Sequence, residues 1–285
     1  MRLLKLYMAL SKIRITFAVT LTTFVGYLLK SRSIDATLWA TVGGIFLLAC
    51  GSAALNQYQE HDSDAKMART KNRPIPSGKI SLSHALVFAL SLIFIGSAIL
   101  YYFSGFLAMQ LGILTLIWYN AFYTPLKKKT AFAVVPGSFI GALPPLVGYA
   151  AAGGSILDPQ IIAFAFFMFM WQIPHFWLIV IRHGNDYLEG GFPSITAIYS
   201  LKQIKGITLI WVFATAVSSL FMIVMGVFSA LALKIILVLI VIALIVAFSS
   251  WFFKQGGGEK VFKYFMGINI YLLSILILIV IGIYI

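Results

Sequence analysis

One segment of the chain, beginning at Asn56, combines an amide, acids and cations and reads NQYQEHDSDAKMARTKNRP. If the segment is helical, Asn56, Glu60 and Asp64 lie on one face, because side chains four positions apart share a side of an α-helix. Asp62 points elsewhere unless the helix ends there. Carboxylates are ligands that Mg²⁺ prefers, and substrate phosphate oxygens commonly complete its shell. The pattern favours a site for a metal and a phosphorylated ligand.

The acids lead into a stretch that is rich in cations. Pro74 prevents the helix from continuing, since proline lacks a backbone N–H and clashes with the preceding turn. Arg69, Lys71 and Arg73 are therefore expected in a loop just past the acids. Guanidinium groups match phosphate oxygens in geometry and charge, so the loop suits a phosphorylated ligand. The alternative is an ion-pair network at a helix end.

A second polar group begins at Trp171 and reads WQIPHFWLIVIRHGNDYLEGG. On a helix, Gln172, His175, Arg182 and Asp186 fall on one side, which gives an apolar stretch a polar stripe that rises toward the inner membrane surface. Pro174 frees a backbone carbonyl near this stripe, and a helix that lines a cavity tolerates such a carbonyl. The stripe favours a cavity, although His175 alone is also consistent with a hydrogen-bonded core histidine.

A third feature is the basic turn YNAFYTPLKKKTAF, which starts at Tyr119 and contains Lys127, Lys128 and Lys129. Lysines neutralise phosphate, but they are also the ordinary signal that keeps a loop on the inner side of a membrane. Farther on, GALPPLVGY from Gly141 places small residues and prolines within an apolar run, which suggests packing around a pocket. The three groups together describe a diphosphate and metal site above an apolar tunnel. A transporter of an anionic solute would also fit.

Membrane helices are the elements that must position these groups. Of the 285 residues, 61% are hydrophobic and 10% are charged, and the mean hydropathy is +0.99. This composition excludes an ordinary soluble domain, in which about a quarter of the residues are charged, and the single cysteine excludes a disulfide framework. A bilayer crossing takes roughly 20 apolar residues. The stretches without Asp, Glu, Lys or Arg are 15–29, 36–59, 80–126, 130–157, 159–181, 206–233, 235–253 and 264–285.

The longest of these stretches, 80–126, has room for two helices with a break near Gly105, so nine spans are expected. Nine spans place the two termini on opposite sides of the membrane. With the N-terminus inside, all but three of the 21 Lys and Arg residues fall on the inner side, as the positive-inside rule requires. The three exceptions are Lys30, Arg32 and Lys234.

The sequence thus predicts an all-α integral membrane protein, a single domain over residues 1–285, with nine transmembrane helices in a bundle around a central cavity. Its N-terminus is expected inside and its C-terminus outside. Asp158 and Pro159 are expected to open the sixth span as the N-cap and first helical residue, and residues 255–258 to form a turn between the last two spans. The net charge of +13 indicates topology and attraction to anionic lipid rather than a nucleic-acid partner.

Three motifs resemble those of the UbiA-type intramembrane prenyltransferases, and the similarity extends over the whole chain. The motifs are Asn56 through Met67 with Arg69, Thr70, Arg73 and Pro74; the turn Tyr123-Thr124, Leu126-Lys127-Lys128 and Thr130, followed by Pro144-Pro145; and Trp171-Gln172, Pro174-His175-Phe176-Trp177 with Asp186-Tyr187. The last motif is most similar to the branch of the family that farnesylates haem, whereas the first marks only the family.

The resemblance implies transfer of a farnesyl group from farnesyl diphosphate to a vinyl group of haem B, with Mg²⁺ as cofactor. It also implies a bacterial or archaeal cytoplasmic membrane, an active site that faces the cytoplasm, and haem-delivery or haem A synthesis proteins as partners. The roles that it implies are catalysis for Asn56, Glu60, Asp64, Asp186 and Lys127; metal binding for Glu60, Asp62, Asp64 and Asp186; diphosphate binding for Arg69, Arg73, Tyr123, Lys127, Lys128 and Arg182; and haem contact for Gln172 and His175.

The sequence departs from the family pattern at a few positions. Glu60 stands where the family usually has Asp, although its longer arm still reaches a metal, and Ala133 stands where an Asn is usual. The segment from Phe192 to Ile195 replaces the usual V/I-P-M-L sequence. These departures concern the acceptor more than the reaction. A prenyltransferase that acts on a quinone precursor or another lipid acceptor is therefore the first alternative, and a solute transporter is the second.

Overall fold

The computed structural model describes residues 2–254 and 261–285, and this part of the chain contains helices and no strands. Its long helices are α2 (Ile13–Ser31), α3 (Ala36–Gln59), α5 (Leu82–Ile99), α6 (Phe106–Ile117), α9 (Phe139–Ala151), α10 (Pro159–Glu189), α12 (Leu201–Val224), α13 (Leu231–Phe253) and α14 (Val261–Tyr284). Its short elements are α1 (Arg2–Leu10), α4 (His61–Lys66), α7 (Thr124–Leu126), α8 (Val134–Gly137), α11 (Ile195–Ile198) and the π-helical turns η1 (Leu100–Ser104) and η2 (Trp118–Tyr123). The predicted turn at residues 255–258 lies outside the described residues.

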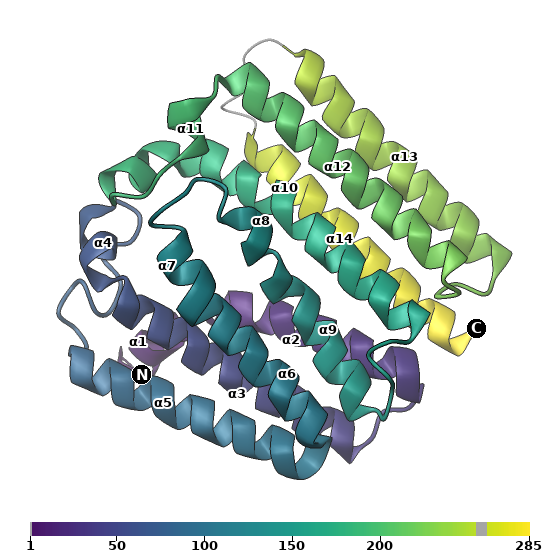
Figure 1. Cartoon of the computed structure of the whole chain (residues 1–285), viewed down its shortest axis with the longest axis horizontal. Helices are drawn as coiled ribbons and strands as arrows, with labels where there is room; N and C mark the ends of the chain where they lie inside the picture. The colour runs from purple at the N-terminus through teal and green to yellow at the C-terminus, as the bar shows by residue number, and fades with distance from the viewer. Residues whose placement is uncertain (1, 255–260) are drawn as a thin grey trace.

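The predicted number of spans is confirmed, because nine helices of the described chain are long and apolar enough to cross a membrane. The stretch 80–126 divides at Gly105, whose φ of 92° is readily adopted only by glycine. The long helices run side by side and the two termini lie at opposite ends of the bundle (Figure 1). The side of the membrane on which each terminus lies stays a prediction.

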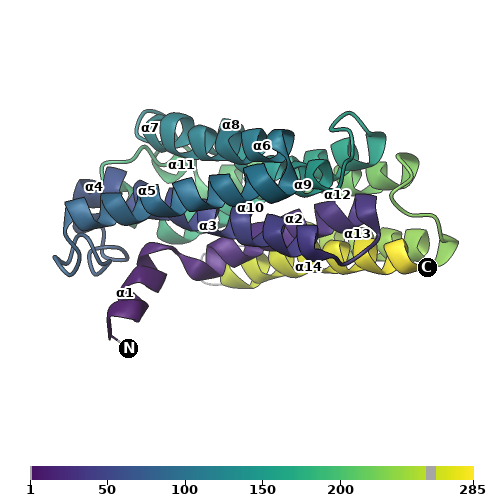
Figure 2. The same ribbon diagram turned by 90° about the horizontal axis from the view of Figure 1, so that it is seen from below.

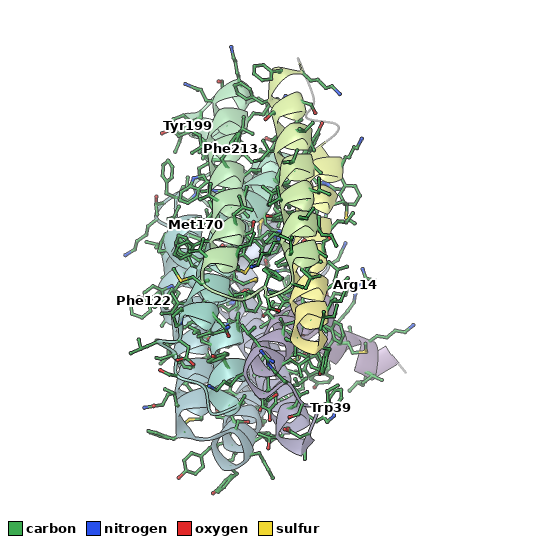
Figure 3. All side chains as sticks on the ribbon, turned by 90° about the vertical axis from the view of Figure 1, so that its right-hand side faces the viewer. Arg14, Trp39, Phe122, Met170, Tyr199 and Phe213 are labelled. Carbon is green, nitrogen blue, oxygen red and sulfur yellow. The ribbon has the colours of Figure 1, made fainter. Side chains whose placement is uncertain are left out.

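The short helices α4, α7 and α11 gather at the same end of the bundle, where α10 ends and α12 begins (Figure 1). Helix α1 leaves the bundle at an angle, as Figure 2 shows. Large apolar side chains such as Trp39, Phe122 and Phe213 point outward (Figure 3) and are 59%, 55% and 42% exposed. An outward-facing apolar surface is what lipid contact requires. Polar loops at one end and an apolar belt elsewhere therefore fit a membrane-embedded bundle.

Glycine brings the backbones of several helix pairs into direct contact. A Cβ on Gly26 of α2 would collide with the backbone of Pro145 in α9, and one on Gly148 of α9 would collide with the backbone of Thr23. In the same way, a Cβ on Gly96 of α5 would lie 2.7 Å from the carbonyl oxygen of Gly44 in α3. Small residues allow this close approach, on which membrane helices rely for packing.

Two proline positions explain local features of α10. Pro174 cannot donate to the carbonyl of Met170, and Thr215 Oγ1 of α12 donates to that oxygen instead, at 3.0 Å. The carbonyl predicted to be freed at this proline therefore joins α10 to α12. At the other end, α10 begins at Pro159 as predicted, but Asp158 does not cap it through its side chain. Its carboxylate accepts a hydrogen bond from Tyr149 Oη at 2.8 Å instead.

Candidate functional site

The predicted acidic face at the end of α3 is present and buried. Helix α3 ends at Gln59, and α4 follows after Glu60, so the chain turns only slightly between the two helices. Asn56, Glu60 and Asp64 are 1%, 4% and 1% exposed. Asp62 points away from this face, with a side chain that is 86% exposed and lies 3.2 Å from the His61 ring. The helix thus presents one amide and two carboxylates to the interior.

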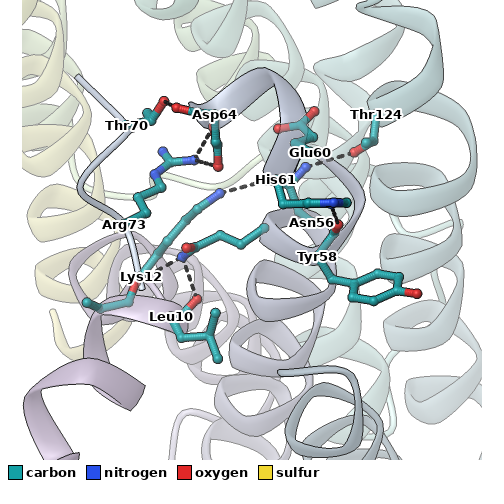
Figure 4. Close-up of polar contacts among 12 residues, drawn as sticks. Leu10, Lys12, Asn56, Tyr58, Glu60, His61, Asp64, Thr70, Arg73 and Thr124 are labelled. Carbon is teal, nitrogen blue, oxygen red and sulfur yellow. Dashed lines mark hydrogen bonds and ion pairs between the residues drawn. The ribbon is translucent and has the colours of Figure 1, made fainter. Parts of the chain in front are cut away.

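Each buried carboxylate has a cation from another segment beside it. Arg73 Nη1 donates to both oxygens of Asp64, at 2.9 and 2.7 Å (Figure 4). Lys127 Nζ lies 2.5 Å from Glu60 Oε1. This lysine is also 5.5 Å from the centres of the Tyr123 and Phe192 rings. Four of the predicted acids and cations therefore converge into one network, built from α3, α4 and the loops after α4 and α7. They are Glu60, Asp64, Arg73 and Lys127.

The network also includes Lys12, which the sequence motifs do not single out. Its Nζ donates to Asn56 Oδ1 at 2.7 Å (Figure 4). Lys12 immediately precedes α2, and its left-handed backbone, with φ 49° and ψ 46°, turns the chain there. Gln57 Nε2 fixes this turn by donating to the carbonyls of Ala9 and Leu10, at 3.0 and 2.9 Å. The N-terminal segment thus carries a cation to the acidic face.

Burial, followed by the nearby charges of Arg73 and Lys127, lowers the pKa of Lys12 to about 7. These effects outweigh the attraction of Glu60 and Asp64, which acts to raise the pKa. A depressed lysine pKa means that the surroundings disfavour its charged form. An anion that entered the site would supply the missing opposite charge and favour that form again. The arrangement of Lys12, Arg73 and Lys127 is therefore suited to a multiply charged anion.

A second feature that the sequence motifs do not single out is the hydrogen bonding of Asn120, in η2. Its Oδ1 accepts from Ser52 Oγ at 2.6 Å, and its Nδ2 donates to the carbonyl of Ser52 and to Gln59 Oε1 at 3.1 and 3.0 Å. Gln59 Nε2 donates back to the carbonyl of Asn120 at 3.1 Å. Thr124 lies one turn after Asn120, and its Oγ1 accepts a hydrogen bond from Asn56 Nδ2 at 3.1 Å. These bonds fix η2 against α3 and so set the position of Tyr123 and Lys127 relative to Glu60.

We expect Asn120→Ala to raise the KM for the diphosphate substrate about tenfold, which corresponds to roughly 1.4 kcal/mol, because Lys127 loses its fixed position opposite Glu60. Ser104→Ala is the matched control, since Ser104 joins the other π-helical turn to α3 through a buried bond to Thr41 Oγ1 at 2.8 Å. It should lower the unfolding temperature without changing KM. Steady-state kinetics and thermal unfolding of both variants test this, and equal KM values in the two variants would contradict it.

The second polar group lies on α10, where the helix is distorted at His183, with φ −124° and ψ 23°. The distortion lies between Arg182 and Asp186. His183 Nδ1 is 3.8 Å from Asp186 Oδ2. The Arg182 guanidinium lies 4.5 Å from the centre of the Phe262 ring in α14. A pocket of about 380 Å³ opens at this bend, lined by Arg182, His183, Asn185, Asp186 and Thr196 among others.

Farther into the membrane, α10 carries three buried side-chain atoms that have no hydrogen-bond partner among the described residues. They are Gln172 Oε1, His175 Nδ1 and Trp177 Nε1, and the first two belong to the predicted polar stripe. The amide oxygen of Gln172 fills the space next to Gly141, where a Cβ would collide with it. The His175 ring lies between those of Trp171 and Phe265, at 4.6 and 4.9 Å between centres. Buried polar atoms without partners are costly in a fold and indicate a ligand contact.

The predicted site residues therefore fall into three sets. The acidic face, with Arg73, Tyr123 and Lys127, forms the network; Arg182 and Asp186 line the pocket on α10; and Gln172 and His175 lie deeper. Asp62, Arg69 and Lys128 are exposed and belong to none of these sets. Within the described chain no three His, Cys, Asp or Glu side chains come together as a complete metal site. Carboxylates and an amide oxygen still suit Mg²⁺, which needs only one or two of them when phosphate oxygens supply the rest.

Comparison with known proteins identifies the class. The pattern of the UbiA prenyltransferase family matches residues 19–275. The chain belongs to this family. It is an integral membrane protein, as the nine apolar helices indicate.

Among its relatives are several proteins named protoheme IX farnesyltransferase. The one from Geobacter sulfurreducens is 44% identical over 172 residues, which are 60% of this chain and 63% of that protein. The one from Bdellovibrio bacteriovorus is 31% identical over 97% of this chain and 95% of its own length. The match to the first relative thus spans less than two thirds of its length, whereas the match to the second spans nearly all of it.

Solved structures show the same fold. A digeranylgeranylglyceryl phosphate synthase superposes with a TM-score of 0.77 at 19% identity and covers 99% of both chains. A UbiA homologue from Archaeoglobus fulgidus, bound to GPP and Mg²⁺, superposes with a TM-score of 0.71 at 14% identity and covers 98% of this chain and 99% of its own. At these identities the likeness concerns the arrangement of the helices.

Proposed function

We propose that this chain transfers a farnesyl group from farnesyl diphosphate to a vinyl group of haem B and so forms haem O, the hydroxyethylfarnesyl haem. The observation that carries the proposal is the buried network of two carboxylates and three cations, with His175 Nδ1 and Gln172 Oε1 left without partners deeper on the neighbouring α10. The relatives named protoheme IX farnesyltransferase support the choice of acceptor.

The donor half of the reaction needs a dry site with positive charge at the leaving oxygens, because breaking the C–O bond separates a diphosphate from an allylic cation. Lys12, Arg73 and Lys127 would supply that charge. Glu60 and Asp64 would hold Mg²⁺, which adds positive charge at the diphosphate when it is bound. We leave Asp62 out of this set, because its side chain is exposed and directed to His61. We also leave out Asp186, because it lines the separate pocket on α10.

The acceptor half forms a bond between C1 of the farnesyl group and the terminal carbon of the vinyl group. The remaining vinyl carbon becomes cationic and takes up water, which loses a proton, so that the side chain ends as a hydroxyethylfarnesyl group and diphosphate is released. His175 and Gln172 would hold the macrocycle. A neutral imidazole is a common ligand of haem iron. The cytoplasmic membrane is the proposed location, with the site on the cytoplasmic side, and haem-delivery or haem A synthesis proteins are the proposed partners.

The direct test is product analysis after incubation of the purified chain in lipid with haem B, farnesyl diphosphate and Mg²⁺. Mass spectrometry should detect a haem bearing the hydroxyethylfarnesyl group, and chelation of Mg²⁺ should abolish the product reversibly. Release of diphosphate without a modified haem would instead favour a quinone precursor or another lipid acceptor. That outcome would reject haem B as the acceptor and keep the prenyltransferase.

For His175, we expect His175→Ala to weaken haem binding at least tenfold and to leave the KM for farnesyl diphosphate unchanged. The reason is that the ring packs against Trp171 and Phe265 rather than against the carboxylates and cations of the network. Haem titration followed by absorbance measures the first quantity. His84→Ala is the matched control, since His84 is exposed at the start of α5 and bonds to Ser81 Oγ at 2.7 Å. Unchanged haem affinity in His175→Ala would rule out the contact.

A further inference from the structure

The pocket on α10, lined by Arg182, His183, Asn185, Asp186 and Thr196, is produced by features of the local sequence. The backbone at His183 departs from helical geometry and opens the turn. Gly184 allows α11 to approach, because a Cβ at this position would lie 2.5 Å from Thr196 Oγ1. Ser194 Oγ lies 2.8 Å from the same hydroxyl and caps α11 at the Thr196 amide. The result is an open pocket of about 380 Å³ at the polar end of the bundle.

The charges around this pocket differ from those of the acidic network. Lys12, Arg73 and Lys127 each have a polar partner on the acidic face, whereas among the described residues no carboxylate pairs with Arg182. Its guanidinium carbon lies 4.5 Å from the centre of the Phe262 ring. Stacking on a ring leaves the edge of the guanidinium available, and that edge matches a carboxylate. Asp186, the carboxylate among the lining residues, faces His183 Nδ1 at 3.8 Å rather than the guanidinium.

The spacing on α10 links this pocket to the deeper polar atoms. Arg182 follows His175 by seven residues, so the two side chains share one face of the helix about 10 Å apart along its axis. This separation is similar to the reach from the centre of a porphyrin to the carboxylates of its propionate arms. Carboxylates are costly within the hydrocarbon and stable at its polar boundary. An acceptor with an apolar body and carboxylates at one edge therefore fits along this face.

We propose that the α10 pocket binds the carboxylates of the prenyl acceptor through Arg182, with Asn185 and Thr196 as neutral donors. This inference rests on the proposed function, and it moves Arg182 from the predicted diphosphate set to the acceptor set. The shared chemistry is a carboxylate near the membrane surface. Its source is the propionate pair of haem B or, for the alternative acceptor class, the single carboxylate of an aromatic quinone precursor.

The test compares acceptors with and without free carboxylates. Haem B and its dimethyl ester are supplied to the full chain in lipid, as wild type, Arg182→Gln, Arg182→Lys and Arg14→Gln, with farnesyl diphosphate and Mg²⁺. Arg14→Gln is the matched control, because it removes an exposed arginine from α2 with the same change in net charge. Haem binding without Mg²⁺ and farnesyl diphosphate is measured in parallel by absorbance, so that binding is read independently of turnover.

We expect wild type to favour haem B over the diester by about tenfold to hundredfold, the usual effect of a charge-assisted hydrogen bond. Arg182→Gln should reduce the affinity for haem B to that for the diester. The affinity for the diester and the KM for farnesyl diphosphate should stay unchanged. Arg182→Lys should restore part of the preference, and Arg14→Gln should retain all of it.

Three results would overturn the inference. The first is a wild type that binds haem B and its diester equally. The second is an equal loss of affinity for both acceptors in Arg182→Gln. The third is a raised KM for farnesyl diphosphate in that variant, which would return Arg182 to the diphosphate site. If wild type modifies neither haem, the proposed function has failed. The same variants are then supplied with a hydroxybenzoate and its methyl ester. If Arg182→Gln no longer distinguishes the acid from the ester, the result supports the pocket; if it still does, the result rejects the pocket.

Discussion

Asp64→Ala is expected to lower prenyl transfer at least about a hundredfold and to destabilise the fold by about 3 kcal/mol. Asp64 is 1% exposed, and both of its carboxylate oxygens accept from Arg73. The substitution removes a proposed Mg²⁺ ligand and leaves a largely buried guanidinium without its partner. Breaking a buried pair costs more than the pair contributes, because the remaining charge stays desolvated. Turnover at saturating substrate and chemical unfolding measure the two effects.

Asp62→Ala is the matched control for this prediction. It removes a carboxylate from the same short helix, but from a side chain that is 86% exposed. We expect wild-type kinetics within about twofold, since exposed ion pairs contribute little. A large loss in Asp62→Ala, or full Mg²⁺-dependent activity in Asp64→Ala, would show that the acidic face of α3 and α4 has been assigned incorrectly.

The second large effect is expected for Lys127→Ala. This lysine is the cation beside Glu60, and its side chain is only 19% exposed. Its removal leaves Glu60 buried without a counter-charge and takes one positive charge from the leaving group, so kcat should fall at least about a hundredfold. Diphosphate release in single-turnover experiments measures the chemical step directly.

The exposed Lys129, two residues later, provides the control for Lys127. Lys129→Ala should retain normal turnover, because a lysine that serves only as an orientation signal has no part in the reaction. Equal losses in the two variants would mean that the basic turn acts through its overall charge rather than through the contact between Lys127 and Glu60.

The spans were predictable because a bilayer leaves few alternatives. Backbone polar groups must be satisfied within the helix, so a long stretch without charged residues has one available structure. The buried acidic face was also predictable, since Asn56, Glu60 and Asp64 recur at helical spacing. The bend of α10 at His183 was not, because no proline or glycine occupies that position.

The contacts of Lys12 and Asn120 depend on approaches between distant parts of the chain. Lys12 is 44 residues from Asn56, and its direction depends on a left-handed turn that nothing in its residue type announces. Asn120 lies in an apolar run, and its partners Ser52 and Gln59 are on another helix. A π-helical turn inserts a residue and rotates all that follow it. The register of Tyr123 and Lys127 could therefore be known only once η2 was seen.

The backbone contacts through Gly26, Gly96 and Gly148 have a consequence for how such a protein can diversify. They join α2, α3, α5 and α9, which hold the donor side, whereas a Cβ on Gly267 of α14 would meet no neighbouring atom within 4 Å. A side chain added at one of these three glycines shifts a helix, whereas one added at Gly267 leaves the backbones in place. Selection can thus change this face of α14 while the contacts among α2, α3, α5 and α9 are inherited unchanged.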